Sequence, residues 1–519
     1  MILTYLITFS SLAFSVAAGS IADACAQIQV SISGSSEVFY PGSDGYAADI
    51  EHWSLASTQN STCSVEPGTV EDVSVILKVI GETRVPFAVK SGGHGTNPGF
   101  ASTQGIQIAM SRFSHVTLGE DKSTVAVGAG CFWDDAYNAL NGTGRGVVGA
   151  RAPGVGVGGF ILGGGYAYHT SQYGLAMDNV VAYDVVLPNA SIATITRADE
   201  DLWFALRGAG AANFGIVTTF HLVTHPQGDV WGGIFSVGGS QFSALTTAIA
   251  SFSANNTDSR AAVVTGYQYG LGAAFAYNVL FYDGPTPPAG IFDDWLVIPT
   301  LSSDLMTRDF ASFIQSLELI TPIDPGANAY FGSVNVLDYP SELLEYMQEL
   351  DFEVGEYLTA LDPSFFLSIY VEPFSLNYFE DAAIVSPAAY PPLRDRALLP
   401  SIAYYGFKNT SLTDVMLKSL QHTIEGIREK AIELGQDVAH IGEYANYALF
   451  TTPAVDIYGP ENLVRLQDIQ KAVDPDRVFN LTGGFRIREA DVEGKDVGPS
   501  LDVAYQVPLV SSGLRGGGE

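Results

Sequence analysis

One short run of the chain, residues 154–165, holds seven glycines in twelve positions. Glycine loses more backbone freedom on folding than other residues, and inside a helix it costs about 1 kcal/mol against alanine. A run this rich in glycine predicts backbone that lies flat against a large planar or phosphorylated ligand. Gly154, Gly156 and Gly159 also match the GxGxxG pattern of a Rossmann turn, but that turn must open a helix, which the glycines at 163–165 disfavour.

Two further glycine-rich loops support a ligand of this kind. The loop 90–96 reads KSGGHGT and follows a predicted strand, VPFAVK. Its glycine pair presents consecutive backbone N–H groups, which suit a pyrophosphate, and it brings His94 close to whatever the phosphates carry. A plain tight turn with a surface histidine is the alternative. With a third loop at 206–217, these segments predict an extended nucleotide cofactor.

Composition excludes several classes of partner. The 519 residues include 24 Lys+Arg and 56 Asp+Glu, a net charge of −32. Such an acidic surface repels phosphate backbones, so neither nucleic acid nor an anionic membrane surface is an expected partner. With 47% hydrophobic and 15% charged residues, the chain is expected to bury a large core.

The N-terminus and the sequons predict export. Residues 1–18 form an apolar run that ends in small residues, typical of a secretory signal cleaved after Ala18, with a membrane anchor as the alternative. No later stretch reaches 18 uncharged apolar residues, so we do not expect the mature chain to span a bilayer. Six Asn-x-Ser/Thr acceptors fit a secreted glycoprotein: Asn60, Asn141, Asn189, Asn255, Asn409 and Asn480.

The chain has three cysteines, and none lies in a metal-binding pattern. Outside the cell, Cys25 and Cys63 are able to pair, whereas Cys131 is expected to be a buried thiol. His221 and His225 share a strand face but offer no third ligand, so no metal is expected.

The pattern of elements predicts an α+β fold. Residues 64–90 read strand, helix, strand, with Thr69 as a helix N-cap and Asp72 at the capping-box distance. Further segments predict a mixed α+β unit that ends near residue 228: strands at 106–110, 124–127, 180–187 and 216–225, and a helix at 132–140.

A second unit is expected over residues 229–435. Its strands are rich in Tyr and Phe, which predicts a sheet that lines a cavity with one face and carries helices on the other. The predicted strands are 261–270, 274–284, 365–374 and 401–409, and the predicted helices are 241–253, 304–318, 341–349 and 411–434. A final segment, 436–487, is expected to hold a helix at 460–473 and a strand at 485–487, before a loose tail at 488–519.

Several motifs together resemble the PCMH-type FAD-binding domain followed by a berberine-bridge-enzyme-like C-terminal segment. They occur in the family's order across residues 55–487: SGGHG at 91–95, PGVGVGGFILGGGY at 153–166, YGLAMDNV at 173–180, NFGIV at 213–217, YANY at 444–447 and YGPENLVRLQDIQKAVDPDRVFN at 458–480. The resemblance implies FAD bound between two α+β subdomains in residues 19–228. It also implies an antiparallel substrate domain over the flavin ring, and a C-terminal segment that returns to the FAD domain.

The resemblance also implies residue roles. His94 matches the histidine that bonds covalently to the flavin 8α-methyl group, and Val155 matches the position beside the flavin C4a where a small side chain accompanies oxygen access. The remaining implied cofactor contacts are Ser91, Gly92, Gly93, Gly95, Thr96, Gly156, Gly158, Gly159, Gly163, Gly164, Asn213, Gly215, Ile216 and Val217.

Three positions depart from the family pattern. Ala152 stands where bicovalent members have cysteine, which excludes a second bond to the flavin. Lys90 replaces a common arginine with little expected effect. Phe160 occupies a place often held by histidine near the flavin pyrimidine edge, so the hydrogen bond of that histidine is not expected here.

The implied reaction is hydride transfer to flavin, which requires a base near the substrate hydroxyl. Tyr447 is the first candidate, with Tyr444 and Asn446 as supporting groups, and its ordinary pKa of about 10 requires a neighbouring positive charge or partner. A packing role for Tyr447 is the alternative. Glu372 in YVEPF and His169 are further candidates for the cavity, each with a structural role as its alternative.

We therefore predict a secreted, monomeric oxidase that oxidises a small aromatic or secondary-metabolite alcohol or amine and reduces O2 to hydrogen peroxide. The alternatives are a carbohydrate oxidase, an oxidative cyclase and a secreted binding protein without turnover. The sequence contains no GxSxG motif, so it gives no support to a hydrolase.

Overall fold

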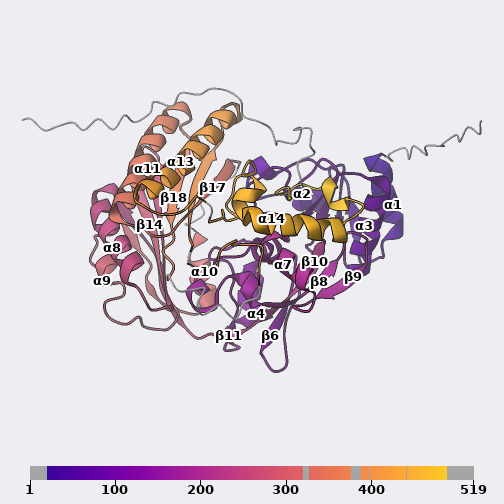
Figure 1. Ribbon diagram of the computed structural model, residues 1–519, viewed down its shortest axis with the longest axis horizontal. Coiled ribbons are helices and arrows are strands. Elements are labelled where there is room, and N and C mark those ends of the chain that lie inside the picture. The colour runs from indigo at the N-terminus through magenta and orange to yellow at the C-terminus, as the bar shows by residue number, and fades with distance from the viewer. Residues whose placement is uncertain are drawn as a thin grey trace, which may run out of the picture.

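The computed structural model describes the following residues of the chain: 20–318, 326–375, 387–394, 396, 398–439 and 441–487. The predicted signal at 1–18 and the predicted tail at 488–519 lie outside the described residues. Two lobes lie side by side, one built from the N-terminal sheets and one from a larger sheet (Figure 1).

The first sheet of the N-terminal lobe has the strand order β1-β2-β4-β3. β2, β3 and β4 run parallel, and β1 is antiparallel to β2. Its strands and neighbouring helices are α1 Ile21–Ser31, β1 Glu37–Phe39, α2 Asp44–Ile50, β2 Cys63–Glu66, α3 Val70–Thr83, β3 Phe87–Lys90 and β4 Ile106–Ala109. The helix α3 supplies the crossover that parallel strands need.

Local sequence explains how α3 begins. The Thr69 hydroxyl accepts a hydrogen bond from the Asp72 backbone N–H at 3.1 Å, which satisfies one of the free donors at the helix start. The Asp72 carboxylate in turn accepts hydrogen bonds from Ser33 and Ser36. The predicted N-cap is confirmed.

The second sheet is antiparallel, with the order β5-β6-β10-β8-β9. Its strands are β5 Val116–Leu118, β6 Thr124–Gly128, β8 Val180–Val186, β9 Ile192–Ile195 and β10 Ile216–Val223. The other elements of this part are α4 Trp133–Leu140, β7 Arg145–Gly146, α5 Val157–Leu162, α6 Thr170–Tyr173, α7 Glu200–Ala209 and β11 His225–Pro226. β7 pairs with β11.

The second lobe is an antiparallel sheet with the order β15-β12-β14-β13-β18-β19-β17, and β16 pairs with β12 beside β15. Its strands are β12 Val230–Gly238, β13 Ala261–Gly270, β14 Ala273–Tyr282, β15 Ser302–Ser303, β16 Met306–Arg308, β17 Asn328–Val336, β18 Phe366–Val371 and β19 Leu399–Phe407. Every residue of β13 and of β19 is buried, so both faces of the sheet centre are covered.

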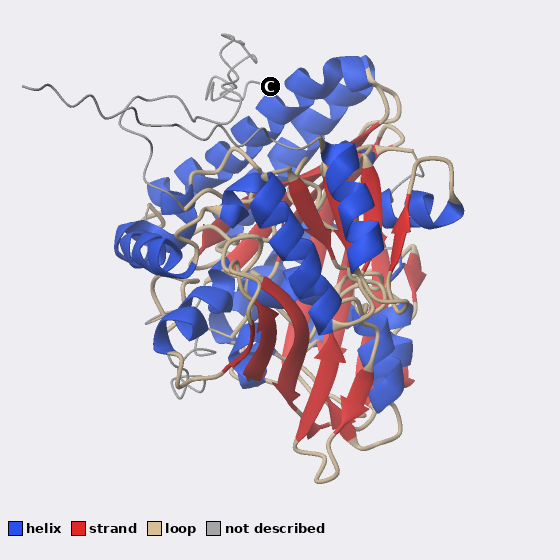
Figure 2. Cartoon of the chain, turned by 90° about the vertical axis from the view of Figure 1, so that its right-hand side faces the viewer, coloured by secondary structure: helices blue, strands red, loops and turns tan. Residues whose placement is uncertain are grey.

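Helices cover one face of this sheet, and Figure 2 shows helices packed along the strands. α11 contacts β13 and β18, and α13 contacts β17 and β19. The helices of this lobe are α8 Phe242–Asn255, α9 Asp293–Leu296, α10 Phe310–Gln315, α11 Ser341–Leu361 and α13 Thr413–Glu433. From the same sheet, Phe331, Tyr370 and Tyr404 line a cavity together with residues of the N-terminal lobe, so the sheet lines a cavity as the sequence predicted.

The C-terminal segment returns to the N-terminal lobe (Figure 1). Its helix α14, Ala454–Val473, is kinked at Gly459, where φ is +69°, and it contacts α7. The Arg84 guanidinium fixes the turn after α14 by donating to the carbonyls of Asp476 and Arg477 at 2.8 and 2.9 Å.

Some predicted elements were wrong in type or extent. Residues 304–318 contain a short strand, β16, before the helix α10, because residues 306–308 pair with β12. The helix predicted at 341–349 extends to Leu361, and residues 485–487 form no strand. The glycine run does open a helix, α5, but it lasts six residues and ends at Gly163.

The structure confirms the pairing of Cys25 with Cys63, which ties α1 to β2. Cys131 is a buried free thiol. Across the described residues, no helix is both long enough and apolar enough to cross a membrane.

Candidate functional site

A cavity of about 360 Å³ lies between the two lobes. The loop 91–97, the glycine run and the segment 211–217 line it from the N-terminal lobe, and strand residues of the large sheet line it from the other side. Residues 444–447 complete the lining from the C-terminal segment. The cavity therefore draws on most of the segments that the sequence motifs singled out, although residues 173–180 do not line it.

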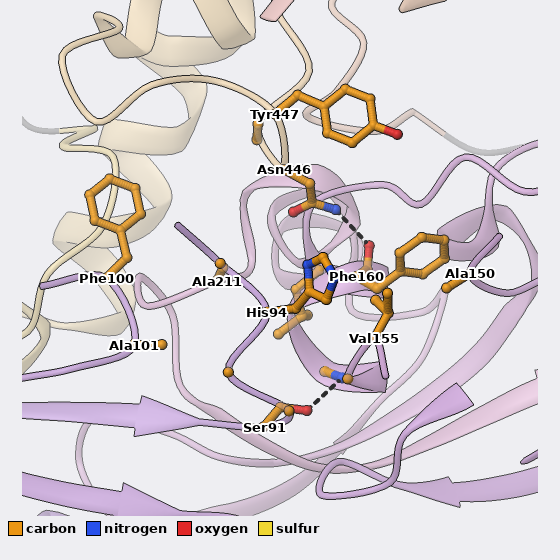
Figure 3. Close-up of a pocket in the computed structure, with 18 of the residues that line it drawn as sticks. Ser91, His94, Phe100, Ala101, Ala150, Val155, Phe160, Ala211, Asn446 and Tyr447 are labelled. Atoms are coloured by element: carbon orange, nitrogen blue, oxygen red, sulfur yellow. Dashed lines mark hydrogen bonds between the residues drawn. The ribbon is translucent and has the colours of Figure 1, made fainter. Parts of the chain in front are cut away.

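Two glycine-rich loops form the floor of the cavity because they pack backbone against backbone. A Cβ atom on Gly92 would lie 2.6 Å from the Gly156 Cα, and one on Gly156 would lie 2.3 Å from the Gly92 nitrogen. The Ser91 hydroxyl joins the loops, accepting a hydrogen bond from the Gly158 N–H at 3.1 Å and donating to the Ala129 carbonyl at 2.6 Å (Figure 3).

His94 projects from the first loop into the cavity (Figure 3). Its ring stacks on Trp53, with centroids 4.7 Å apart and planes 12° from parallel. Burial lowers the pKa of His94 to about 4, so the imidazole is neutral. Its Nε2 atom is buried and has no hydrogen-bond partner among the described residues, which leaves it available to a bound group.

Tyr444 and Asn446 hold the glycine run in place. The Asn446 amide donates to the Phe160 carbonyl at 3.1 Å (Figure 3). It also donates to the Tyr444 hydroxyl at 2.8 Å. The same hydroxyl accepts a hydrogen bond from the Gly165 N–H at 3.0 Å. A Cβ atom on Gly163 would lie 2.1 Å from the Asn446 amide oxygen, so this glycine serves the packing of the two segments.

Three buried polar side chains meet on the other side of the cavity. The Arg151 guanidinium donates to the Tyr447 hydroxyl at 2.6 Å and forms an ion pair with Glu372 at 2.8 Å. The Tyr447 hydroxyl donates to the other Glu372 oxygen at 3.3 Å. Arg151 thus supplies the positive charge that Tyr447 requires in order to act as a base. Glu372 is positioned to accept the proton of the Tyr447 hydroxyl.

Burial and charge set how these groups titrate. Burial raises the pKa of the Tyr447 hydroxyl well above its ordinary value, although the Arg151 charge acts against this. Burial also raises the pKa of Glu372, and Arg151 again opposes it. Tyr447 is therefore protonated at rest, and Glu372 is the more acidic partner of the pair.

The cavity provides space and donors that suit a nucleotide cofactor. A Cβ atom on Gly95 or Gly159 would meet nothing within 4 Å, so both glycines leave open space that a ligand would fill. With the unpartnered His94 Nε2, these features fit an FAD held along the loops.

Most of the predicted cofactor residues line this one cavity, but three do not. Gly163 and Gly164 lie behind it against the C-terminal segment. The Asn213 amide donates to the carbonyls of Ala209 and Ala211, so it shapes the loop instead of facing the cavity. Of the three departures from the family pattern, Ala152 and Phe160 line the cavity, whereas the Lys90 ammonium binds the carbonyls of residues 48, 49 and 51.

The candidate histidines outside the loops have local partners. His169 lies 3.8 Å from Asp283 and does not line the cavity. His221 contacts Asp184 at 2.9 Å, and His225 contacts the Asn179 amide oxygen at 2.7 Å.

Sequence reasoning missed Trp53, Arg151 and Tyr168. Trp53 lies in a segment without a recognisable pattern. The sequence did offer a signal for Arg151, which is a charged residue at the start of an apolar, glycine-rich run. Tyr168 follows the same run by three residues.

Comparisons with known proteins agree with this geometry. A family model described as an FAD binding domain matches residues 61–196. The FAD-dependent monooxygenase drtC of Aspergillus calidoustus is 28% identical over 491 residues, which cover 91% of this chain and 92% of that protein. An uncharacterized FAD-linked oxidoreductase of Arthroderma benhamiae is 29% identical, with 87% and 92% covered.

Solved structures show the same fold. The 6-hydroxy-D-nicotine oxidase of Arthrobacter nicotinovorans superposes with a TM-score of 0.72 at 18% identity, covering 87% of this chain and 98% of that one. The carbohydrate oxidase of Microdochium nivale gives 0.71 at 21% identity, with 91% and 100% covered.

The fold and the cavity define an FAD-binding oxidoreductase. Within that class, residues 61–196 match the FAD binding domain, and the chain as a whole is similar to proteins described as FAD-dependent monooxygenases and FAD-linked oxidoreductases.

Proposed function

We propose that this protein is a secreted oxidase that carries FAD covalently on His94, oxidises a small aromatic or secondary-metabolite alcohol or amine, and reduces O2 to hydrogen peroxide. The observation that carries the proposal is the neutral His94 in a cavity that also holds the Arg151, Glu372 and Tyr447 cluster. When bound, FAD supplies the hydride acceptor.

The covalent bond requires a neutral histidine nitrogen, and the lowered pKa of His94 supports it. His94 would hold the cofactor by a C–N bond that replaces a C–H bond of the cofactor methyl group and an N–H bond of the imidazole. The two electrons and two protons that this linkage releases would pass to O2 and give hydrogen peroxide. Ala152 in place of cysteine makes this linkage single.

The chain's own residues move the substrate proton. The Tyr447 oxygen accepts the proton of the substrate hydroxyl while its own proton passes to Glu372, along the hydrogen bond that already joins them. Arg151 holds both groups in place and stabilises negative charge on either one. Tyr444 and Asn446 act as positioning residues, because their hydrogen bonds go to the glycine run.

The walls of the cavity favour an aromatic substrate. Phe331, Tyr370 and Tyr404 line it from the large sheet, so a flat apolar ring finds apolar contacts there. A carbohydrate oxidase and an oxidative cyclase are the alternatives that the sequence left open. A monooxygenase, the activity named for several relatives, is a further alternative, because FAD serves oxidation and monooxygenation alike.

Secretion is supported by the disulfide and by exposed sequons. Among the predicted acceptors, five asparagines are exposed: Asn60, Asn141, Asn189, Asn255 and Asn409. We further propose that the protein acts as a monomer.

The test starts with acid denaturation of the purified protein. We expect flavin fluorescence to stay with the polypeptide, and a His94→Ala variant to release it. A flavin lost from the unaltered protein on denaturation would contradict the covalent bond, and a protein without any flavin would contradict the oxidase. Products then separate the reactions: an oxidase gives one peroxide for each substrate oxidised, whereas a monooxygenase gives a product heavier by one oxygen atom.

A further inference from the structure

Two hydrogen-bond donors in the cavity have no acceptor among the described residues. One is the Arg151 Nη1 nitrogen and the other is the Tyr168 hydroxyl, and both atoms are buried. Leaving a buried donor unpaired costs about 1–3 kcal/mol, more for a charged group. A bound molecule that offers an acceptor oxygen removes this cost.

Both donors are held rigidly. The Tyr168 ring packs against Phe281 and Phe313, with centroids 5.0 and 5.2 Å away. Arg151 is fixed by its bonds to Tyr447 and Glu372, so only Nη1 remains free. Both residues line the same cavity, and the charge of Arg151 lowers the pKa of Tyr168, although burial raises it.

The charges in the cavity decide which kind of acceptor fits. Among the described lining residues, Arg151 and Glu372 are the charged pair and they neutralise each other, while His94 is neutral. A carboxylate entering beside Glu372 would add an unbalanced negative charge in a buried site, which is costly. A neutral oxygen satisfies the donors without that cost.

We propose that the substrate carries a neutral carbonyl oxygen on its aromatic framework, and that Arg151 Nη1 and the Tyr168 hydroxyl donate hydrogen bonds to this oxygen. The proposal rests on the proposed function and narrows its substrate class to carbonyl-bearing aromatic compounds. Neither residue needs to move, because both donors already face the cavity with no other partner among the described residues.

The test measures binding to the flavin-loaded protein by calorimetry, and it needs no turnover. Three probes share a benzene ring: acetophenone has a neutral carbonyl oxygen, ethylbenzene lacks it, and benzoate is an anion. We expect acetophenone to bind at least about tenfold more tightly than ethylbenzene, the discrimination that one satisfied buried donor gives. Benzoate is expected to bind more weakly than acetophenone.

Two matched variants show whether the donors are responsible. Tyr168→Phe is expected to reduce the preference for acetophenone over ethylbenzene, because only Arg151 Nη1 is then left to donate to the carbonyl oxygen. Tyr183→Phe removes a hydroxyl that is also buried and unpartnered among the described residues but lies on β8 outside the cavity, so it should keep the preference.

Several outcomes would overturn the proposal. These are equal binding of acetophenone and ethylbenzene, no binding of either, tightest binding of benzoate, or an unchanged preference in Tyr168→Phe. A shifted flavin spectrum in Tyr168→Phe with unchanged acetophenone affinity would assign the hydroxyl to the cofactor instead. Flavin absorbance is checked first, so failure of the proposed function is recognised separately.

Discussion

A carboxylate buried beside a tyrosine titrates differently from one in water, and Glu372 has this environment. It must be ionised to accept a proton, and burial raises its pKa above the ordinary 4.5. We therefore expect kcat/KM to fall as the pH decreases through the raised pKa of Glu372, and to reach its full value above that pKa. We expect kcat/KM to show an acid limb above pH 4.5.

Glu372→Gln should abolish that limb and lower kcat by about 100-fold or more, because the proton loses its acceptor. Steady-state rates across pH measure both effects. Glu443→Gln is the matched control, since Glu443 is another buried glutamate paired with an arginine but does not line the cavity. An acid limb that persists in Glu372→Gln would exclude this glutamate as the acceptor.

Alanine substitutions at two glycines, one in α5 and one at its N-cap, are expected to reduce flavin binding for different reasons. Gly156→Ala forces a Cβ atom against the Gly92 backbone, so it should separate the loops at a cost of about 1–3 kcal/mol and lose flavin as well as structure. Gly159→Ala meets no protein atom and improves helix propensity, so it should keep the fold and lose flavin only.

Circular dichroism and the ratio of flavin to protein distinguish these two glycine variants. Full flavin loading in Gly159→Ala would show that the open space beside this residue does not belong to the cofactor.

Among the elements, α1 and β2 are joined covalently by Cys25 and Cys63, which lie 38 residues apart. Replacing both cysteines with serine should lower the free energy of unfolding by about 3–4 kcal/mol in the chain-entropy model. Denaturant unfolding measures the loss. The expected flavin content of the folded variant is unchanged, because neither cysteine lines the cavity.

Cys131→Ala controls for the loss of a cysteine that forms no disulfide, and its effect on the free energy of unfolding should be smaller. An equal loss in both variants would show that the bridge adds nothing beyond the packing of its sulfur atoms.

The elements also show how far sequence reasoning extends. Short-range signals such as the Thr69 N-cap and the strands at 261–270 and 401–409 were predicted, because capping and apolar runs are local properties. β16 was missed because a three-residue edge strand depends on its partner β12, which lies far away in the sequence.

The candidate site likewise contains some features that the sequence predicted and others that it did not. The loop around His94 was recognisable because its glycines and histidine are consecutive. The pairing of Arg151 with Glu372 and Tyr447 joins residues more than 200 positions apart, and only the packing of the two lobes brings them together. The stacking of Trp53 on His94 also had no sequence signal, because the two residues come from separate segments of the N-terminal lobe that only folding brings together.

For the whole molecule, Asn97 connects the first and last parts of the cavity. Its amide donates to the Ala448 carbonyl at 2.9 Å, and its oxygen accepts from the Phe450 N–H at 3.0 Å. Asn97→Ala should destabilise the fold by about 1–3 kcal/mol and lower kcat, because the loop that carries Tyr447 loses its anchor. The covalent flavin content should remain unchanged.

Asn97→Asp keeps the acceptor but not the donor, so its loss of stability and of kcat should be intermediate. Thermal unfolding and peroxide release measure the series. Activity that is unchanged in Asn97→Ala would show that the segment around Tyr447 is held by its other contacts.

The return of the C-terminal segment to the N-terminal lobe also has a consequence for biosynthesis. The glycine loops and His94 emerge from the ribosome early, whereas Tyr444, Asn446 and Tyr447 are added only near the end of translation. A prematurely terminated chain therefore lacks the residues whose hydrogen bonds hold the glycine run in place. Its cavity lacks part of its lining, so the chain acquires a complete site only when translation is nearly finished.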